Sequence, residues 1–198
     1  QKRRQPDLFW EGRTIPLDDH SVDSVIATEL FEHLPDLDVV LREIARVLKP
    51  GGTLVFTVPF LWPLHDSPWD FCRYTPFSLR QHLEANDFDV RDIKALGGWN
   101  ASLAQMIGLW LNRSGLAADD RKRLFAEFAP FYEQLIRSDK VPAEIKDQMM
   151  SPGFHGVATR RVPAVTRPSG GPRVVIVEEG FPSVSETFIL DQITGLID

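Results

Sequence analysis

Cysteine is nearly absent from this chain of 198 residues, where Cys72 is the only one. A single thiol excludes a disulfide framework and a zinc site built from cysteines, and it fits a reducing cytoplasm. Long hydrophobic runs are also missing: the longest apolar stretch, residues 101–111, is too short to span a bilayer and contains Gln105. No signal-peptide pattern is present. The sequence therefore predicts a cytoplasmic protein without a membrane span.

An excess of basic residues is missing as well. Lys and Arg number 22 against 28 Asp and Glu, which gives a net charge of −6. Proteins that bind the phosphate backbone of a nucleic acid normally show a basic footprint, so we expect no nucleic-acid partner. The other fractions, 43% hydrophobic and 25% charged, are close to the globular average and exclude collagen-like, disordered and coiled-coil chains.

The length allows one domain, or one domain and a piece of another. The chain begins at Gln1 and ends inside a helical pattern, so we expect a segment of a longer protein. Residues 162–172 belong to a stretch rich in Pro, Gly and Arg that has no hydrophobic period, as is typical of a linker. We therefore expect a domain over residues 1–161, this linker, and the start of a second domain over residues 173–198.

Strand and helix patterns follow each other in the order of an α/β fold. Residues 22–27 and 53–58 are almost continuously apolar, which predicts buried parallel strands. Between them, Asp36 is the expected N-cap of a helix over residues 37–48 with one apolar stripe. The three elements form a βαβ unit with a right-handed crossover. Further expected elements are a short strand at 6–10, a helix from Thr75-Pro76, a strand at 88–96, helices near 101–112 and 119–137, the second kinked at Pro130, and a closing strand at 154–159.

The most specific pattern spans residues 15–52, IPLDDHSVDSVIATELFEHLPDLDVVLREIARVLKPGG. It contains an IPL…D-x-V segment that leads into the strand, EHL after the strand, and LREIARVLKPGG at the end of the helix. This order and spacing resemble the half of class I, type 11-like S-adenosylmethionine (SAM) methyltransferases that follows the cofactor loop. The likeness covers about residues 6–161 and continues through an insert of one methyltransferase subgroup, here Pro59, His65, Pro68, Asp70 and Arg73-Tyr74-Thr75.

The resemblance implies a Rossmann-like methyltransferase sheet without its first strands, and SAM as the cofactor. The family's glycine-rich loop and the acidic residue that ends its second strand are absent, so only the far wall of the cofactor site is expected. Glu11-Gly12 match an acidic–small pair near the adenine amine, although a solvated turn is the alternative for Glu11. Ile15 matches an apolar residue that packs near adenine. Thr28-Glu29-Leu30 would face the methionine end, outside the carboxyl end of a strand.

Methyl transfer is chiefly a positioning task, and a hydroxyl acceptor also needs a base. His33 and His65 are the candidate bases, because a neutral imidazole accepts a proton near neutral pH. The alternative for His33 is that Glu32-His33 cap or brace the following helix. We expect no metal site, because no third ligand converging with His65 and Asp70 is evident.

The loop after the second buried strand carries the candidate acceptor-binding residues Asp70, Arg73 and Tyr74. Together with His65 they would lie over the substrate pocket in a lid-like loop. The alternative is a polar network that satisfies itself, in which Arg73 bonds to Asp70.

The end of the chain has a resemblance of its own. Residues 173–197, RVVIVEEGFPSVSETFILDQITGLI, resemble the opening of a family 4-like retaining glycosyltransferase, which has two Rossmann domains and uses nucleotide-sugars. In that family the first strand leads into an FP-x-x-SETF loop, here residues 181–188. The alternative is a βα unit that completes the methyltransferase sheet.

Together the resemblances predict SAM-dependent methyl transfer to a small-molecule or glycan-type acceptor. The protein would be a bifunctional methyltransferase and glycosyltransferase that serves surface polysaccharide or glycolipid biosynthesis, an inference by association. The alternative is a degenerate methyltransferase fold that serves as a non-catalytic scaffold for the glycosyltransferase. Because half of the cofactor site is missing, we expect the 198 residues alone to bind SAM weakly or not at all and to be inactive.

Overall fold

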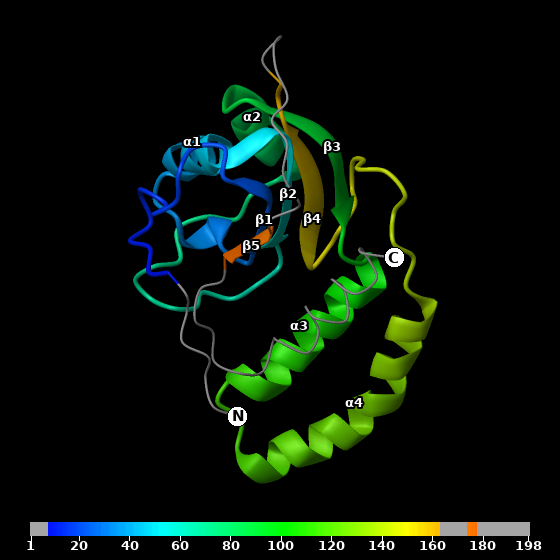
Figure 1. Ribbon diagram of the computed structural model, residues 1–198. Coiled ribbons are helices and arrows are strands. Elements are labelled where there is room, and N and C mark those ends of the chain that lie inside the picture. The colour runs from blue at the N-terminus through cyan, green and yellow to red at the C-terminus, as the bar shows by residue number, and fades with distance from the viewer. Residues whose placement is uncertain (1–7, 163–173, 178–198) are drawn as a thin grey trace.

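The computed structural model describes residues 8–162 and the short strand 174–177 (Figure 1). The described elements are β1 (Val22–Thr28), the 3-10 turn η1 (Phe31–His33), α1 (Leu37–Val47), β2 (Leu48–Pro59), α2 (Pro76–Ala85), β3 (Phe88–Ala95), α3 (Trp99–Arg113), α4 (Ala118–Ser138), β4 (Gly153–Arg160) and β5 (Val174–Val177). Apart from Val162, the expected linker lies outside the described residues, and so does the expected glycosyltransferase motif at 181–188.

The strands form one five-stranded mixed sheet in the order β3-β4-β2-β1-β5. β1 is parallel to β2, whereas β4 is antiparallel to both β2 and β3. The predicted βαβ unit is confirmed as β1-α1-β2, and the predicted Rossmann-like sheet is confirmed in this mixed form. The carboxyl ends of β1 and β2 therefore lie side by side at one edge of the sheet.

The strand predicted near residues 173–177 is present, but its partner differs from the one expected. We expected it to open a second Rossmann-like unit, whereas β5 pairs in parallel with β1, from Ser24 opposite Val174 to Ala27 opposite Val177. The pairing agrees with the alternative of a strand that completes the methyltransferase sheet. The physical reason is that an uncovered sheet edge presents unpaired N–H and C=O groups, which any strand-forming segment can satisfy.

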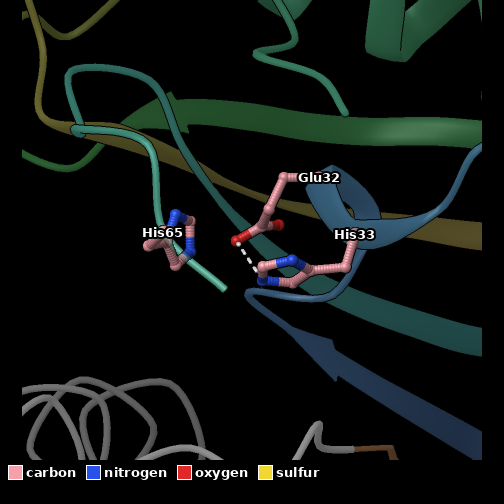
Figure 2. Close-up of side chains that lie close together, drawn as sticks. All are labelled: Glu32, His33 and His65. Atoms are coloured by element: carbon pink, nitrogen blue, oxygen red, sulfur yellow. Dashed lines mark ion pairs between the residues drawn. The ribbon is translucent and has the colours of Figure 1, made fainter. Parts of the chain in front are cut away.

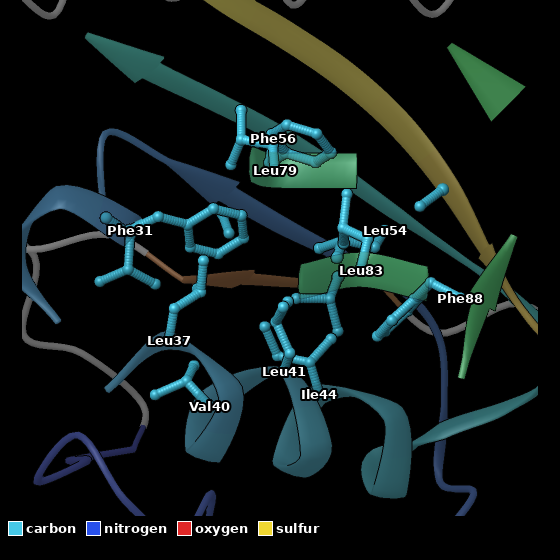
Figure 3. Close-up of a cluster of buried hydrophobic side chains, with 14 of the residues drawn as sticks. Phe31, Leu37, Val40, Leu41, Ile44, Leu54, Phe56, Leu79, Leu83 and Phe88 are labelled. Carbon is cyan, nitrogen blue, oxygen red and sulfur yellow. The ribbon is translucent and has the colours of Figure 1, made fainter. Parts of the chain in front are cut away.

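The hydrophobic core lies between the sheet and two helices. α1 buries Leu41 and Ile44, with exposed fractions of 0% and 1%, and α2 adds Leu79 and Leu83 to the same cluster (Figure 3). Fully burying a side chain of this size contributes about 1.5–3 kcal/mol. Both predicted caps are present: Asp36 accepts from the Val39 N–H at 3.3 Å and Thr75 accepts from the Ser78 N–H at 3.2 Å. These contacts hold the ends of β1 and β2 in place.

Two predicted boundaries are wrong. The strand expected at 6–10 does not form over its described residues, and Phe9 is 83% exposed there. An apolar run without a neighbouring strand has no partner for its backbone, so the pattern alone does not make a strand. The second buried strand, expected at 53–58, begins earlier, because β2 runs from Leu48 through Lys49-Pro50-Gly51-Gly52 to Pro59, while α1 ends at Val47 just before this stretch.

The helices α3 and α4 form a hairpin to one side of the sheet (Figure 1). The rings of Trp110 and Phe128 pack edge to face across it, with centroids 6.1 Å apart. Both helices were predicted, and α4 continues through Pro130 to Ser138. No helix in the described part of the chain is long and apolar enough to cross a membrane.

Candidate functional site

A polar cluster lies beyond the carboxyl ends of the parallel strands β1 and β2. The chain leaves β1 through Glu29 into η1, which carries Glu32 and His33, and it leaves β2 into a loop over residues 60–75. Glu29 has a left-handed φ of 47°, and its N–H donates to both the carbonyl and the hydroxyl oxygen of Thr57, each at 3.1 Å. The two strand ends are thus joined directly, at the edge where open α/β sheets bind their ligands.

The 60–75 loop is clamped to η1 and to itself. The carbonyl oxygen of Glu32 accepts from the N–H groups of Phe71 and Cys72, at 2.9 and 3.2 Å. The guanidinium of Arg73 donates to both Asp70 oxygens, at 2.5 and 2.8 Å. It also donates to the carbonyl oxygens of Cys72 and Pro63, at 2.8 and 3.2 Å. The self-satisfied Arg73–Asp70 network that was the alternative is therefore present.

Asp70 is the centre of that network, and its side chain is only 4% exposed. The Arg73 guanidinium, followed by smaller contributions from the backbone N–H and ring of His65, lowers the pKa of Asp70 to about 2. The carboxylate is therefore ionised at neutral pH. It accepts from the His65 N–H at 3.1 Å and lies 3.2 Å from Nδ1 of the same residue.

The two predicted bases, His33 and His65, lie together. Their ring centroids are 4.9 Å apart in an edge-to-face arrangement. Nδ1 of His33 donates to the carbonyl oxygen of Trp69 at 2.9 Å, which fixes the tautomer because a carbonyl can only accept. The loop thus supplies a hydrogen-bond acceptor to each imidazole.

Glu32 belongs to the same cluster, although the sequence did not single it out as a candidate site residue. It is 0% exposed, and its Oε1 lies 3.6 Å from Nε2 of His33 (Figure 2). Within the described part of the chain neither carboxylate oxygen has a hydrogen-bond donor. Burial, followed by the neighbouring Glu29 carboxylate, raises the pKa of Glu32 to about 9. Such a group is neutral at pH 7 or needs a cationic partner.

No third ligand was expected to converge with His65 and Asp70, but the structure brings a different set together, Glu32 with His33 and His65. Glu32, His33 and His65 each offer one ligand atom, and these atoms all lie within 4.8 Å of one another. Adjacent helical residues normally point about 100° apart, so sequence spacing gave no reason to bring Glu32 and His33 to one point. The 3-10 turn and the long 60–75 loop decide it. The only signal in the sequence was the EHL motif itself.

The predicted cofactor residues separate into two groups. Thr28 and Leu30 are buried at the end of β1, next to Glu29, whose pKa is raised by burial. Glu11 is exposed in the segment before β1, and Gly12 has a φ of 80° there. The structure thus joins the residues at the end of β1 to the polar cluster.

Ile15 is buried and is held against α1. Its N–H donates to Glu43 at 2.9 Å and its carbonyl oxygen accepts from Arg46 at 2.8 Å. The loop that carries this candidate adenine contact is therefore fixed by the helix that packs on the sheet.

Tyr74 lies apart from the other predicted acceptor residues. It is 8% exposed and belongs to the hydrophobic core, where its ring packs edge to face on His82 of α2 with centroids 5.9 Å apart. Asp70 and Arg73 remain next to His65, as predicted.

The amino-terminal part of the chain matches a known protein family. Residues 7–56 match the family described as "Methyltransferase domain". Methyltransferase GfsG of Streptomyces halstedii is 52% identical over 40 residues, which are 20% of this chain and 14% of that protein. Malonyl-[acyl-carrier protein] O-methyltransferase 1 of Coxiella burnetii is 31% identical over 129 residues, 52% of this chain and 46% of that protein. The chain thus spans less than half of the length of either relative.

Solved structures of methyltransferases are also similar to the chain, at low TM-scores. A SAM-dependent methyltransferase from Aquifex aeolicus has a TM-score of 0.38 and 25% identity, with 44% of this chain and 47% of that chain covered. Phosphoethanolamine N-methyltransferase 2 of Haemonchus contortus, solved with S-adenosylhomocysteine, has a TM-score of 0.40 and 13% identity, with 74% and 35% covered. The family match and the curated relatives thus agree that residues 7–56 are similar to methyltransferase domains.

Proposed function

We propose that the protein transfers a methyl group from SAM to a small-molecule or glycan-type acceptor. The observation that carries this proposal is the cluster of Glu29, Glu32, His33 and His65 at the carboxyl ends of two adjacent parallel strands. Three of these four residues lie within the segment that matches the methyltransferase family. A purely scaffolding domain has no need of buried titratable groups at this edge, so the enzyme is favoured over the scaffold.

The residues present fit one side of the cofactor. SAM carries a positively charged sulfonium and an ammonium group, and the buried carboxyls of Glu29 and Glu32 at the end of β1 suit both charges. Thr28, Glu29 and Leu30 would contact the methionine end, Ile15 the adenine, and Glu11-Gly12 the adenine amine. When bound, the cofactor supplies an electrophilic methyl group, and the chain's part is to hold it in line with the acceptor.

His65 and His33 are the candidate groups that take the proton of a hydroxyl acceptor. Asp70 lies beside Nδ1 of His65 and stays ionised, so it would stabilise the imidazolium that forms. Arg73 fixes Asp70 and is 22% exposed, which leaves part of its guanidinium open to an acceptor oxygen.

A titration of S-adenosylhomocysteine into the 198-residue chain, followed by amide chemical shifts, tests the proposed cofactor wall. We expect weak binding, with shift changes concentrated at Ile15 and at residues 28–34. Glu29→Gln should weaken this binding, whereas Glu133→Gln on the exposed face of α4 should not. Shift changes confined to α3 and α4, or equal effects of the two variants, would contradict the proposed site.

We also propose that this domain is fused to a glycosyltransferase in a cytoplasmic protein that serves surface polysaccharide or glycolipid biosynthesis. The support is the FP-x-x-SETF pattern at residues 181–188 and the Pro- and Gly-rich stretch at 162–172, together with the low cysteine content. Limited proteolysis of the chain tests the boundary. Cleavage within 162–172 should release the carboxyl-terminal segment and leave the remaining domain folded; a cleaved segment that stays bound would favour the alternative, in which β5 completes the sheet.

A further inference from the structure

Three donor side chains from two separate segments converge on one point. Glu32 and His33 come from η1 and His65 from the 60–75 loop, and their ligand atoms lie within 4.8 Å of one another (Figure 2). Two ligand atoms on a tetrahedral zinc ion, each about 2.1 Å from the metal, lie about 3.4 Å apart. The separation of 3.6 Å between Oε1 of Glu32 and Nε2 of His33 is close to that value.

The second nitrogen of each imidazole is held as metal-binding histidines are usually held. Nδ1 of His33 donates to a backbone carbonyl, that of Trp69, and Nδ1 of His65 lies 3.2 Å from a carboxylate oxygen of Asp70. Such partners fix the tautomer in which Nε2 carries the lone pair, and they orient the ring.

One nearby contact could oppose this tautomer of His65, because Nη2 of Arg73 lies 3.5 Å from the same Nδ1. That guanidinium nitrogen already donates to Asp70 at 2.8 Å and to the Pro63 carbonyl at 3.2 Å. The contact from Nδ1 of His65 to Asp70 is the shorter of the two, at 3.2 Å, and it therefore sets the tautomer.

Glu32 supplies the negative charge that a cation needs. Its side chain is 1% exposed, and neither oxygen accepts a hydrogen bond from the described residues. A buried carboxylate without donors is costly, and coordination of a cation is one of the few arrangements that offset the cost. The backbone carbonyl of Glu32 also anchors the loop that carries His65, so the two ligand-bearing segments are fixed to each other.

We propose that the carboxylate of Glu32 and Nε2 of both His33 and His65 bind one divalent cation of the zinc class, with Trp69 and Asp70 as the outer partners. A His2Glu set leaves a coordination position open for water or a substrate oxygen. The inference goes beyond the proposed function and changes two assignments in it, because Glu32 would then face the metal and leave Glu29 to face the charges of the cofactor. Imidazoles that ligate a cation do not act as bases, so activation of an acceptor hydroxyl would pass to the metal.

Calorimetric titration of zinc chloride into the chelator-treated 198-residue chain tests the proposal. We expect one ion per chain. Glu32→Gln, which keeps the shape of the side chain but removes its charge, and His65→Gln should each weaken binding by about 100-fold or more, beyond the 10–100-fold typical of an outer partner. Asp70→Asn should fall within that smaller range. The visible absorption of bound Co²⁺ should show a tetrahedral site in the unchanged chain and lose it in Glu32→Gln and His65→Gln.

His82→Gln is the matched control, because Nδ1 of His82 also pairs with an aspartate oxygen, that of Asp38 at 2.8 Å, outside the cluster. It should bind zinc as the unchanged chain does. Circular dichroism without zinc identifies any variant that has lost its fold. If Glu32→Gln is unfolded, His65→Gln decides the outcome, because the His65 side chain is more exposed than that of Glu32. Absence of binding near one ion per chain, unchanged binding in folded Glu32→Gln or His65→Gln, or an equal loss in His82→Gln would overturn the proposal.

Discussion

Removing the guanidinium of Arg73 is the most direct perturbation of the loop that forms the site. In Arg73→Ala the Asp70 carboxylate, 4% exposed, loses both of its charge-assisted bonds, and the Pro63 carbonyl loses a donor. Removing one partner of a buried ion pair costs about 3–5 kcal/mol, and because Arg73 itself is 22% exposed we expect the lower end, about 3 kcal/mol.

A double-mutant cycle separates the ion pair from simple loss of packing. In Asp70→Asn the buried charge is gone, so a further Arg73→Ala leaves no unpaired carboxylate behind. The loss of unfolding free energy in the double variant should therefore be smaller than the sum of the two single losses by at least 1 kcal/mol. Residues in contact typically show interaction energies of about 0.5–3 kcal/mol. Urea unfolding at pH 7 gives the free energy of unfolding of the unchanged chain, the two single variants and the double variant. A chelator in the buffer removes any contribution from bound metal. Arg137→Ala, from an exposed pair on α4, should cost less than about 0.5 kcal/mol. A loss below 1 kcal/mol in Arg73→Ala, or additivity in the cycle, would refute the reasoning.

The remaining predictions concern the frame that positions the site. Leu41→Ala should cost about 2–5 kcal/mol in urea unfolding, because the side chain is fully buried in the core. Gly52→Ala should also destabilise the fold, since a Cβ there would lie 2.8 and 2.9 Å from two backbone carbonyl oxygens; a melting temperature equal to that of the unchanged chain would contradict this. Hydrogen bonds from Arg46 and from His82 lower the pKa of Glu43 and of Asp38, respectively. Their stabilisation should therefore be complete above the pKa values of the unfolded chain, about 4.3 and 3.9, and be lost as the pH falls through the lower folded values. Glu43→Gln should flatten this acid limb of a stability–pH profile, and an unchanged limb would exclude the role of Glu43.

The βαβ unit was predictable because its causes are local. The cap at Asp36, the apolar stripe through Leu41 and Ile44, and the buried runs of β1 and β2 each follow from the order of side chains along the chain. Thr75-Pro76 at the start of α2 is predictable for the same reason.

Partners that lie far apart in the sequence were less predictable. Asp38 was available to pair with Arg42 one turn along α1, yet it accepts from His82 and Asn86, at 2.8 and 2.7 Å. Likewise the strand at 174–177 was predictable as a strand, but not as the partner of β1. In both cases several partners satisfy the same group, and packing selects among them.

The sequence by itself determined the chemistry available to this protein: the methyltransferase pattern of residues 15–52, the imidazoles of His33 and His65, and the Asp70–Arg73 pair. Only the tertiary structure decided that Glu32 turns inward beside both imidazoles and that Tyr74 packs in the core. The physical reason is that local patterns fix which face of an element is apolar. The direction of a polar side chain after a strand depends instead on how a turn and a distant loop pack against each other.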